Sequence, residues 1–88
     1  MIYKVVMTAK FARSFKILDR SVQIMIKMWI EKNLINTDDP RLHGKPLSGN
    51  LSKYWRYRIG DYRLLAEIND DELIIVAVNI GHRKEIYK

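Results

Sequence analysis

The pattern of apolar and polar residues changes its period along the chain. In the first half apolar residues recur at helical spacing, whereas in the last third they alternate with polar residues as in strands. The chain begins with the β-branched and aromatic run 2–7, which predicts a short strand. Thr8 is a suitable N-cap for a first helix, whose apolar positions are Phe11, Phe15 and Leu18.

A second helix is expected to follow, with Asp19 or Ser21 as its N-cap. Its apolar stripe has the spacing i, i+3, i+4, i+7, i+8 and consists of Val22, Met25, Ile26, Trp29 and Ile30. Ile24 and Met28 widen this stripe, so we expect the helix to pack on two sides. Tryptophan and methionine at this spacing favour a hydrophobic core over a ligand site.

The segment 36–53 is predicted to be a long loop, because it starts with NTDDP and holds most of the glycine and proline. Strands are expected at 54–59, 62–69 and 73–80. The last is an apolar run, which favours a central strand covered on both faces. The order β-α-α-β-β-β predicts one α+β domain, 1–88, with two N-terminal helices packed on one face of a small antiparallel-rich sheet.

The sequence YWRYRIGDYR predicts a hairpin that gathers arginines on one face. Gly60 and Asp61 suit a two-residue type II′ turn, which pairs Arg58 with Arg63. Alternation then assigns to the helix-covered face Trp55, Tyr57, Ile59, Tyr62, Leu64, Ala66 and Ile68. The other face carries Arg56, Arg58, Arg63, Leu65 and Glu67. Facing arginines repel, and a phosphate bound across both would relieve the repulsion, although solvated surface arginines are the competing interpretation.

Composition narrows the classes of function. The 88 residues are 48% hydrophobic and 30% charged, which is typical of one small folded domain. The absence of cysteine excludes disulfide frameworks and thiolate chemistry, and it fits a cytoplasmic protein. The longest apolar run, 73–78, is too short for a membrane span. The net charge of +6 indicates an anionic partner, and 41–63 carries most of that charge.

The tail GHRKEIYK is the other candidate for chemistry. Gly81 ends the last strand, so we expect His82 and Arg83 at its end, near the arginine face. We expect no metal site, because His43 and His82 are the only histidines and the carboxylates form no close group. The sequence also contains no phosphate-binding glycine loop and no hydrolase motif, and no cofactor is expected.

Four segments together resemble the RelE branch of the RelE/ParE toxin superfamily in order and spacing. They are HGKPLSGN (43–50), WRYRIGDYRLLAEI (55–68), the apolar strand 73–80 and GHRKEIY (81–87). The resemblance implies a type II toxin that enters the ribosomal A site and cuts mRNA without a metal. In that reaction the 2′-hydroxyl of the cut nucleotide attacks the adjacent phosphate, leaving a 2′,3′-cyclic phosphate and a 5′-hydroxyl.

The resemblance also implies roles for five residues. Arg56 and Arg58 match the basic residues of the family's active strand, and Arg63 matches its phosphate-contacting arginine. Arg83 matches the arginine that protonates the leaving 5′-oxygen or stabilises charge there. Tyr87 matches the C-terminal tyrosine that contacts the cut nucleotide.

Arginine stays protonated at neutral pH and is therefore a poor general base. We hypothesise that His82 is the general base, or the proton donor while Arg83 stabilises the phosphorane, because histidine titrates near neutral pH. The basic residues of the loop, Arg41, His43, Lys45 and Lys53, are assigned to contacts with the RNA or ribosome backbone.

The resemblance further implies a cognate antitoxin related to RelB, a toxin that is monomeric alone, and larger assemblies with the antitoxin. Two other functions stay open. The gyrase-poisoning branch shares the fold without the nuclease, and the presence of Arg63, His82, Arg83 and Tyr87 argues against it. A non-enzymatic module that binds nucleic acid or an antitoxin is compatible with the composition.

Overall fold

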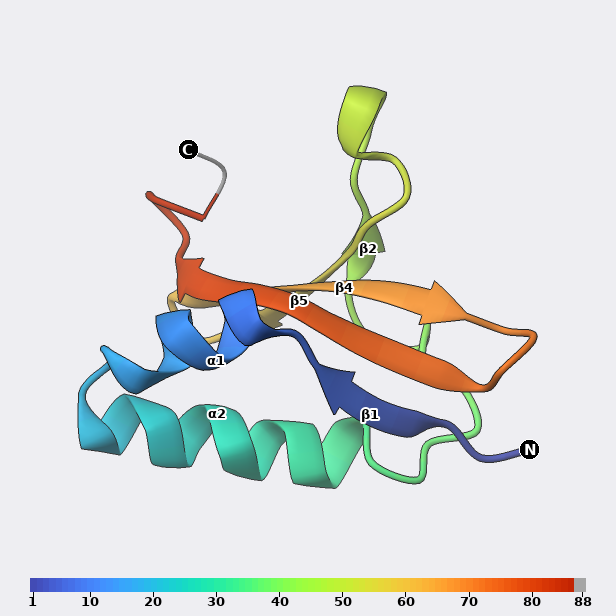
Figure 1. Cartoon of the computed structure of the whole chain (residues 1–88), viewed down its shortest axis with the longest axis horizontal. Helices are drawn as coiled ribbons and strands as arrows, with labels where there is room; N and C mark the ends of the chain where they lie inside the picture. The colour runs from blue at the N-terminus through green and yellow to red at the C-terminus, as the bar shows by residue number, and fades with distance from the viewer. Residues whose placement is uncertain (87–88) are drawn as a thin grey trace.

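The computed structural model describes residues 1–86 as a five-stranded sheet with two helices packed against it (Figure 1). In chain order the elements are β1 (Lys4–Met7), α1 (Ala9–Lys16), α2 (Arg20–Asn33), β2 (Lys45–Pro46), the 3₁₀ helix η1 (Gly49–Leu51), β3 (Trp55–Ile59), β4 (Tyr62–Asn69) and β5 (Ile74–His82). The strand order is β1-β5-β4-β3-β2; β1 is parallel to β5 and the other pairs are antiparallel. The predicted α+β class with two N-terminal helices is confirmed.

The two faces of the sheet are covered differently. Figure 1 shows α1 and α2 on one side, whereas β2 with η1 and residues 83–86 lie on the other. Residues 43–54, which contain β2 and η1, are called the arm below. Within residues 1–86 no helix is long and apolar enough to cross a membrane.

Thr8 joins the first strand, the first helix and the sheet. Its Oγ1 accepts a hydrogen bond of 3.0 Å from the Phe11 amide, which confirms it as the N-cap of α1. The same hydroxyl donates a hydrogen bond of 2.8 Å to the Val78 carbonyl on β5. Phe11 is buried and stacks on Phe15, so α1 is held against the sheet by both its cap and its apolar face.

The prediction that α2 packs on two sides is wrong. Ile26 and Ile30 are buried, but Ile24 is 49% exposed and Met28 is 63% exposed. The helix forms the outermost layer, so only its inward stripe meets other residues. The remaining core is contributed largely by the sheet and comprises Tyr3, Phe11, Leu34, Tyr57, Ile59, Leu64, Ala66, Ile75, Ala77 and Ile80.

Strand β5 is an interior strand, as predicted, but its expected burial on both faces is wrong. Ile75, Ala77 and Ile80 are buried beneath the helices, whereas Val76 and Val78 are only half-buried. The helices cover a single face, so the apolar run does not indicate a second covering layer here. The face opposite the helices is covered only in part, by the arm and by residues 83–86.

Candidate functional site

The predicted hairpin and its register are confirmed. Gly60 has a φ of 59°, as the first central position of a type II′ turn requires, and Ile59 pairs with Tyr62. Arg58 lies opposite Arg63, and the pairing continues through Tyr57–Leu64 and Arg56–Leu65. A two-residue turn with glycine at its strained position fixes this register, which in turn fixes the face of every side chain.

Four basic residues share the face that the helices leave open. Strand β2 adds Lys45, which pairs directly with Arg56, while Arg58 pairs with Arg63. Directly paired residues project to the same face of an antiparallel sheet. We call Lys45, Arg56, Arg58 and Arg63 the basic face. The sequence predicts three of its members there, and the fourth depends on a two-residue strand that was expected to be loop.

The guanidinium groups of the basic face have different surroundings. Arg63 is only 9% exposed, and its Nη1 donates to the carbonyls of Tyr62 (3.2 Å) and Gly60 (3.4 Å). Arg58 is exposed. The Nε of Arg56 is buried and has no hydrogen-bond partner among residues 1–86. A buried donor without a partner is unfavourable, so an acceptor supplied by a ligand would stabilise it.

The C-terminal tail turns back over the same end of the sheet. The Arg83 amide donates to the Asp61 carbonyl (2.9 Å), which holds Arg83 beside the hairpin turn. Ile86 is buried and packs on Gly81, where an added Cβ would lie 3.3 Å from its Cδ1. Gly81 pairs with Arg63, so Ile86 lies next to the basic face. Tyr87 lies outside the described residues.

His82 lies at the predicted end of the last strand but on the opposite face of the sheet from the arginines. It lies at the end of β5, as expected, but it pairs with Tyr62, and the two rings meet edge-on at 5.6 Å. Its Nδ1 accepts from the Lys84 amide (3.2 Å). Because Tyr62 belongs to the opposite face from Arg63, the expected position near the arginine face is wrong.

A β-bulge explains the position of His82. Leu65 pairs with Asn79, but the next residue of β4, Ala66, pairs with Ala77, so Val78 is an extra residue in β5. One extra residue reverses which side chains face the helices. Without it, residue 82 would share the face of the arginines.

Arg41 and His43, two of the predicted RNA-contacting residues, make contacts away from the basic face. Arg41 makes a bidentate contact with Asp70, with both distances 3.0 Å, and the Tyr3 hydroxyl donates to the same carboxylate (2.6 Å). The hydrogen bond from Arg41, with that from Tyr3, lowers the pKa of Asp70. Arg41 also lies over the Trp55 ring, on the helix side of the sheet. The ring of His43 lies edge-on against Trp29.

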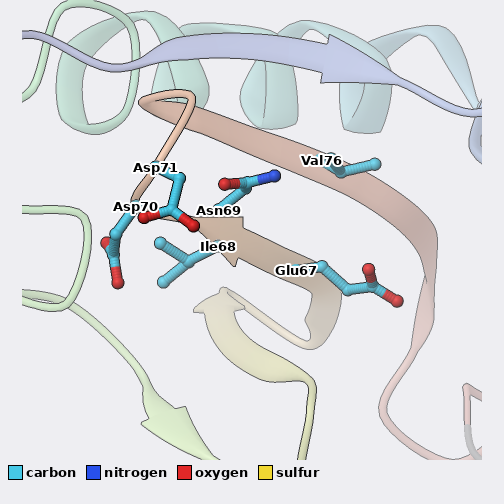
Figure 2. Close-up of a pocket in the computed structure, with 6 residues that line it drawn as sticks. All are labelled: Glu67, Ile68, Asn69, Asp70, Asp71 and Val76. Carbon is cyan, nitrogen blue, oxygen red and sulfur yellow. The ribbon is translucent and has the colours of Figure 1, made fainter.

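Lys53 lies at the margin of the open face. Its Nζ is 3.6 Å from Oε1 of Glu67, so this lysine is paired with a carboxylate. Glu67 also lines an open pocket of about 390 Å³. Among the other lining residues, Figure 2 shows Asp70 and Asp71 at the turn after β4. Strand β4 thus runs from Arg63 at its basic end to acidic residues at the other.

Among residues 1–86 no three His, Asp or Glu side chains are placed to hold a metal ion.

Comparison with known proteins gives a consistent set of relatives. Residues 5–87 match the family described as the ParE toxin of the type II toxin–antitoxin system parDE. Toxin RelE3 of Methanocaldococcus jannaschii is 34% identical over 86 residues, covering 96% of this chain and 94% of the relative.

Solved structures agree with these sequence matches. The toxin–antitoxin complex RelBE2 from Mycobacterium tuberculosis contains a chain that is 28% identical, with a TM-score of 0.85 over 94% of this chain and 100% of that one. The RelB–RelE antitoxin–toxin complex from Methanococcus jannaschii gives 26% identity and a TM-score of 0.61, over 94% and 95% of the two chains.

Proposed function

This chain belongs to the ParE toxin family of type II toxin–antitoxin systems, and we propose that it is a RelE-type endonuclease that cuts mRNA in the ribosomal A site. In this proposal it acts in the cytoplasm and stops translation by cutting the message that elongating ribosomes are reading. The observation that carries the proposal is the direct pairing of Arg58 with Arg63, beside Arg56, whose Nε has no hydrogen-bond partner within residues 1–86.

Electrostatics supports an anionic substrate. Like charges directly opposite in a sheet destabilise it by up to ~1 kcal/mol. A phosphate between the two guanidinium groups reverses the sign of the interaction and accepts charge-assisted hydrogen bonds. The buried position of Arg63 strengthens its interaction with an anion, because less water screens it.

The proposed reaction needs no metal. The 2′-oxygen of the cut nucleotide attacks the adjacent phosphorus, its proton is removed, and the bond from phosphorus to the 5′-oxygen breaks. Arg58 and Arg63 stabilise the added negative charge of the phosphorane. Arg83 stabilises or protonates the departing 5′-oxygen, and Tyr87 contacts the cut nucleotide. The products are a 2′,3′-cyclic phosphate and a 5′-hydroxyl.

His82 remains the proposed general base, with a structural role as the alternative. Its ring lies against Tyr62 on the other face, and its Nδ1 accepts from the Lys84 amide. Proton transfer would therefore require the ring to leave Tyr62 and turn around the sheet end. If the ring stays in place, His82 instead positions the segment that carries Arg83.

We further propose that an antitoxin related to RelB neutralises this toxin by laying a helix or strand on it and covering the basic face. The two solved relatives above were captured as complexes of toxin with antitoxin. The toxin alone is proposed to be a monomer. A pocket of about 480 Å³ between β1, α1 and α2, with Phe11, Phe15 and Ile30 among its lining residues, offers an apolar anchor for the antitoxin.

Toeprinting of mRNA on programmed ribosomes tests this function. Wild-type protein is expected to produce cuts that Arg83→Ala abolishes, whereas Lys84→Ala, an exposed neighbour, serves as the matched control. Cleavage by His82→Ala at the wild-type rate would reject both roles of His82, as general base and as the residue that positions Arg83. No cuts by wild-type protein would overturn the nuclease. Inhibition of gyrase supercoiling, or salt-sensitive RNA binding without product, would then identify the other two functions.

A further inference from the structure

Two pairs of like charge stand next to each other on the basic face. Lys45 pairs with Arg56 across β2 and β3, and Arg58 pairs with Arg63 across β3 and β4. Arg56 and Arg58 are two residues apart on one strand, so the pairs are displaced by about 7 Å along β3. A single RNA strand presents one phosphate per nucleotide at a spacing of this order.

Among residues 1–86, the first of these pairs, Lys45 with Arg56, has no neutralising side chain. The carboxylate nearest in register, Glu67, is already paired with Lys53 at 3.6 Å. Lys45 and Arg56 make no ion pair within residues 1–86 that would balance them, and the Nε of Arg56 is buried without an acceptor. The pair of Lys45 and Arg56 therefore offers an anion two positive charges and one hydrogen-bond donor, the Arg56 Nε, that lacks an acceptor.

The arm is built to hold Lys45 in this position. Gly44 has a φ of +84°, and a Cβ on it would lie 2.2 Å from the Arg56 carbonyl oxygen, so only glycine permits the approach of β2 to β3. The Trp55 Nε1 donates to the His43 carbonyl (2.7 Å) from the opposite face. Lys45 is thus fixed by the residues before it and across from it.

We propose that Lys45 and Arg56 bind the RNA phosphate next to the one that is cut, which lies between Arg58 and Arg63. This inference rests on the proposed function and extends it. The RNA backbone runs along β3, from the hairpin turn towards the arm. Each of the two pairs of basic residues then contacts one of two successive phosphates. Lys45 is then a substrate-positioning residue that fixes which linkage lies beside Arg63.

The test measures retention of the toxin on ribosomes programmed with a non-cleavable mRNA, in which the attacking 2′-oxygen is methylated. A single phosphate is replaced by an uncharged methylphosphonate, either at the cut linkage or at one of its two neighbours. Lys45→Ala is expected to weaken retention on the unmodified message about tenfold. Neutralising one particular neighbouring phosphate should weaken retention of the wild-type protein at least as much, because it removes the contacts of both Lys45 and Arg56, and it should abolish the effect of Lys45→Ala.

Lys53→Ala is the matched control, because it removes an arm lysine that is paired with Glu67. Its effect should add to that of every methylphosphonate. Additive effects of Lys45→Ala at both neighbouring linkages, or coupling to the cut linkage itself, would overturn the inference. Cleavage of unmodified mRNA is measured in parallel. If the toxin is retained and Lys45→Ala couples to one methylphosphonate but no mRNA is cut, only the nuclease is rejected. If mRNA is cut but Lys45→Ala couples to neither neighbouring methylphosphonate, only the phosphate assignment is rejected. No retention of wild-type protein overturns both.

Discussion

The indole Nε1 of Trp55 donates a hydrogen bond of 2.7 Å to the main-chain carbonyl of His43, joining the sheet to the start of the arm. Because the acceptor is main chain, the bond fixes the path of the polypeptide whatever side chain residue 43 carries. This geometry also agrees with the prediction that Trp55 packs on the helix-covered side of the sheet.

Trp55→Phe should therefore loosen the arm while keeping most of the apolar packing. We expect a loss of about 1 kcal/mol in the free energy of unfolding, measured by urea denaturation. Faster amide exchange should be confined to residues 43–47. His43→Ala keeps the acceptor and is the control. Equal changes in exchange for both variants would show that the hydrogen bond does not hold the arm.

Gly44 and Gly49 make a matched pair for the close approach of β2 to β3. Both have positive φ, +84° and +66°, so alanine is strained at either position. A Cβ on Gly49 meets nothing within 4 Å, whereas one on Gly44 meets the Arg56 carbonyl at 2.2 Å. We expect Gly49→Ala to destabilise the fold by about 1 kcal/mol and Gly44→Ala by about 3 kcal/mol.

Urea denaturation of the two glycine variants gives the comparison directly. Gly44→Ala should also reduce mRNA cleavage beyond its effect on the folded fraction, because it displaces Lys45 from Arg56. Equal destabilisation by the two substitutions would mean that backbone strain alone accounts for both and that the approach of the strands is adjustable.

The sequence predicts the hairpin well because two independent signals agree there. The turn residues Gly60 and Asp61 set the register, and the alternation from Trp55 to Ile68 sets the faces. Thr8 is likewise predictable, since a local cap needs only nearby residues. These local rules account for both helices, for four of the five strands and for three of the four residues of the basic face.

Two features depend on distant parts of the chain and escape prediction. Strand β2 has only two residues, and it pairs because Gly44 permits contact with a strand that comes later. The face of His82 is set by the extra residue Val78, and no turn or propensity signal marks a bulge inside an apolar run. The only available sign of the arm is the sequence Gly-Lys-Pro, which is compatible with many loops.

Asp70 should make stability depend on pH in acid. The hydrogen bond from Arg41, followed by that from Tyr3, lowers the pKa of this carboxyl in the folded state. A lowered pKa gives stabilisation that is present above the unfolded-state value of ~3.9 and is lost as the pH falls through the folded-state value. We therefore expect Asp70→Asn to flatten the fall in unfolding free energy between pH 5 and pH 2.

Denaturation curves across that pH range test this dependence. Asp71→Asn removes the carboxylate beside Asp70 in Figure 2, which does not contact Arg41 or Tyr3, and should leave the slope near that of the wild type. An unchanged slope in Asp70→Asn would show that other carboxylates dominate acid unfolding. The cluster is distant from the basic face in register, so mRNA cleavage at neutral pH should change little in folded Asp70→Asn protein.

Arg58→Gln should separate stability from function. Arg58 faces Arg63 in the sheet, so replacing its charge with a neutral polar side chain is expected to stabilise the fold by up to ~1 kcal/mol at low salt. The gain should shrink as salt rises, because the Debye length falls from about 30 Å at 0.01 M to about 3 Å at 1 M. Cleavage on ribosomes should fall at least about tenfold, since one charged contact to the phosphate is lost. Lys84→Gln, outside the strands, should change neither quantity. A variant that loses stability and activity together would instead make Arg58 a structural residue whose charge is satisfied in the free protein.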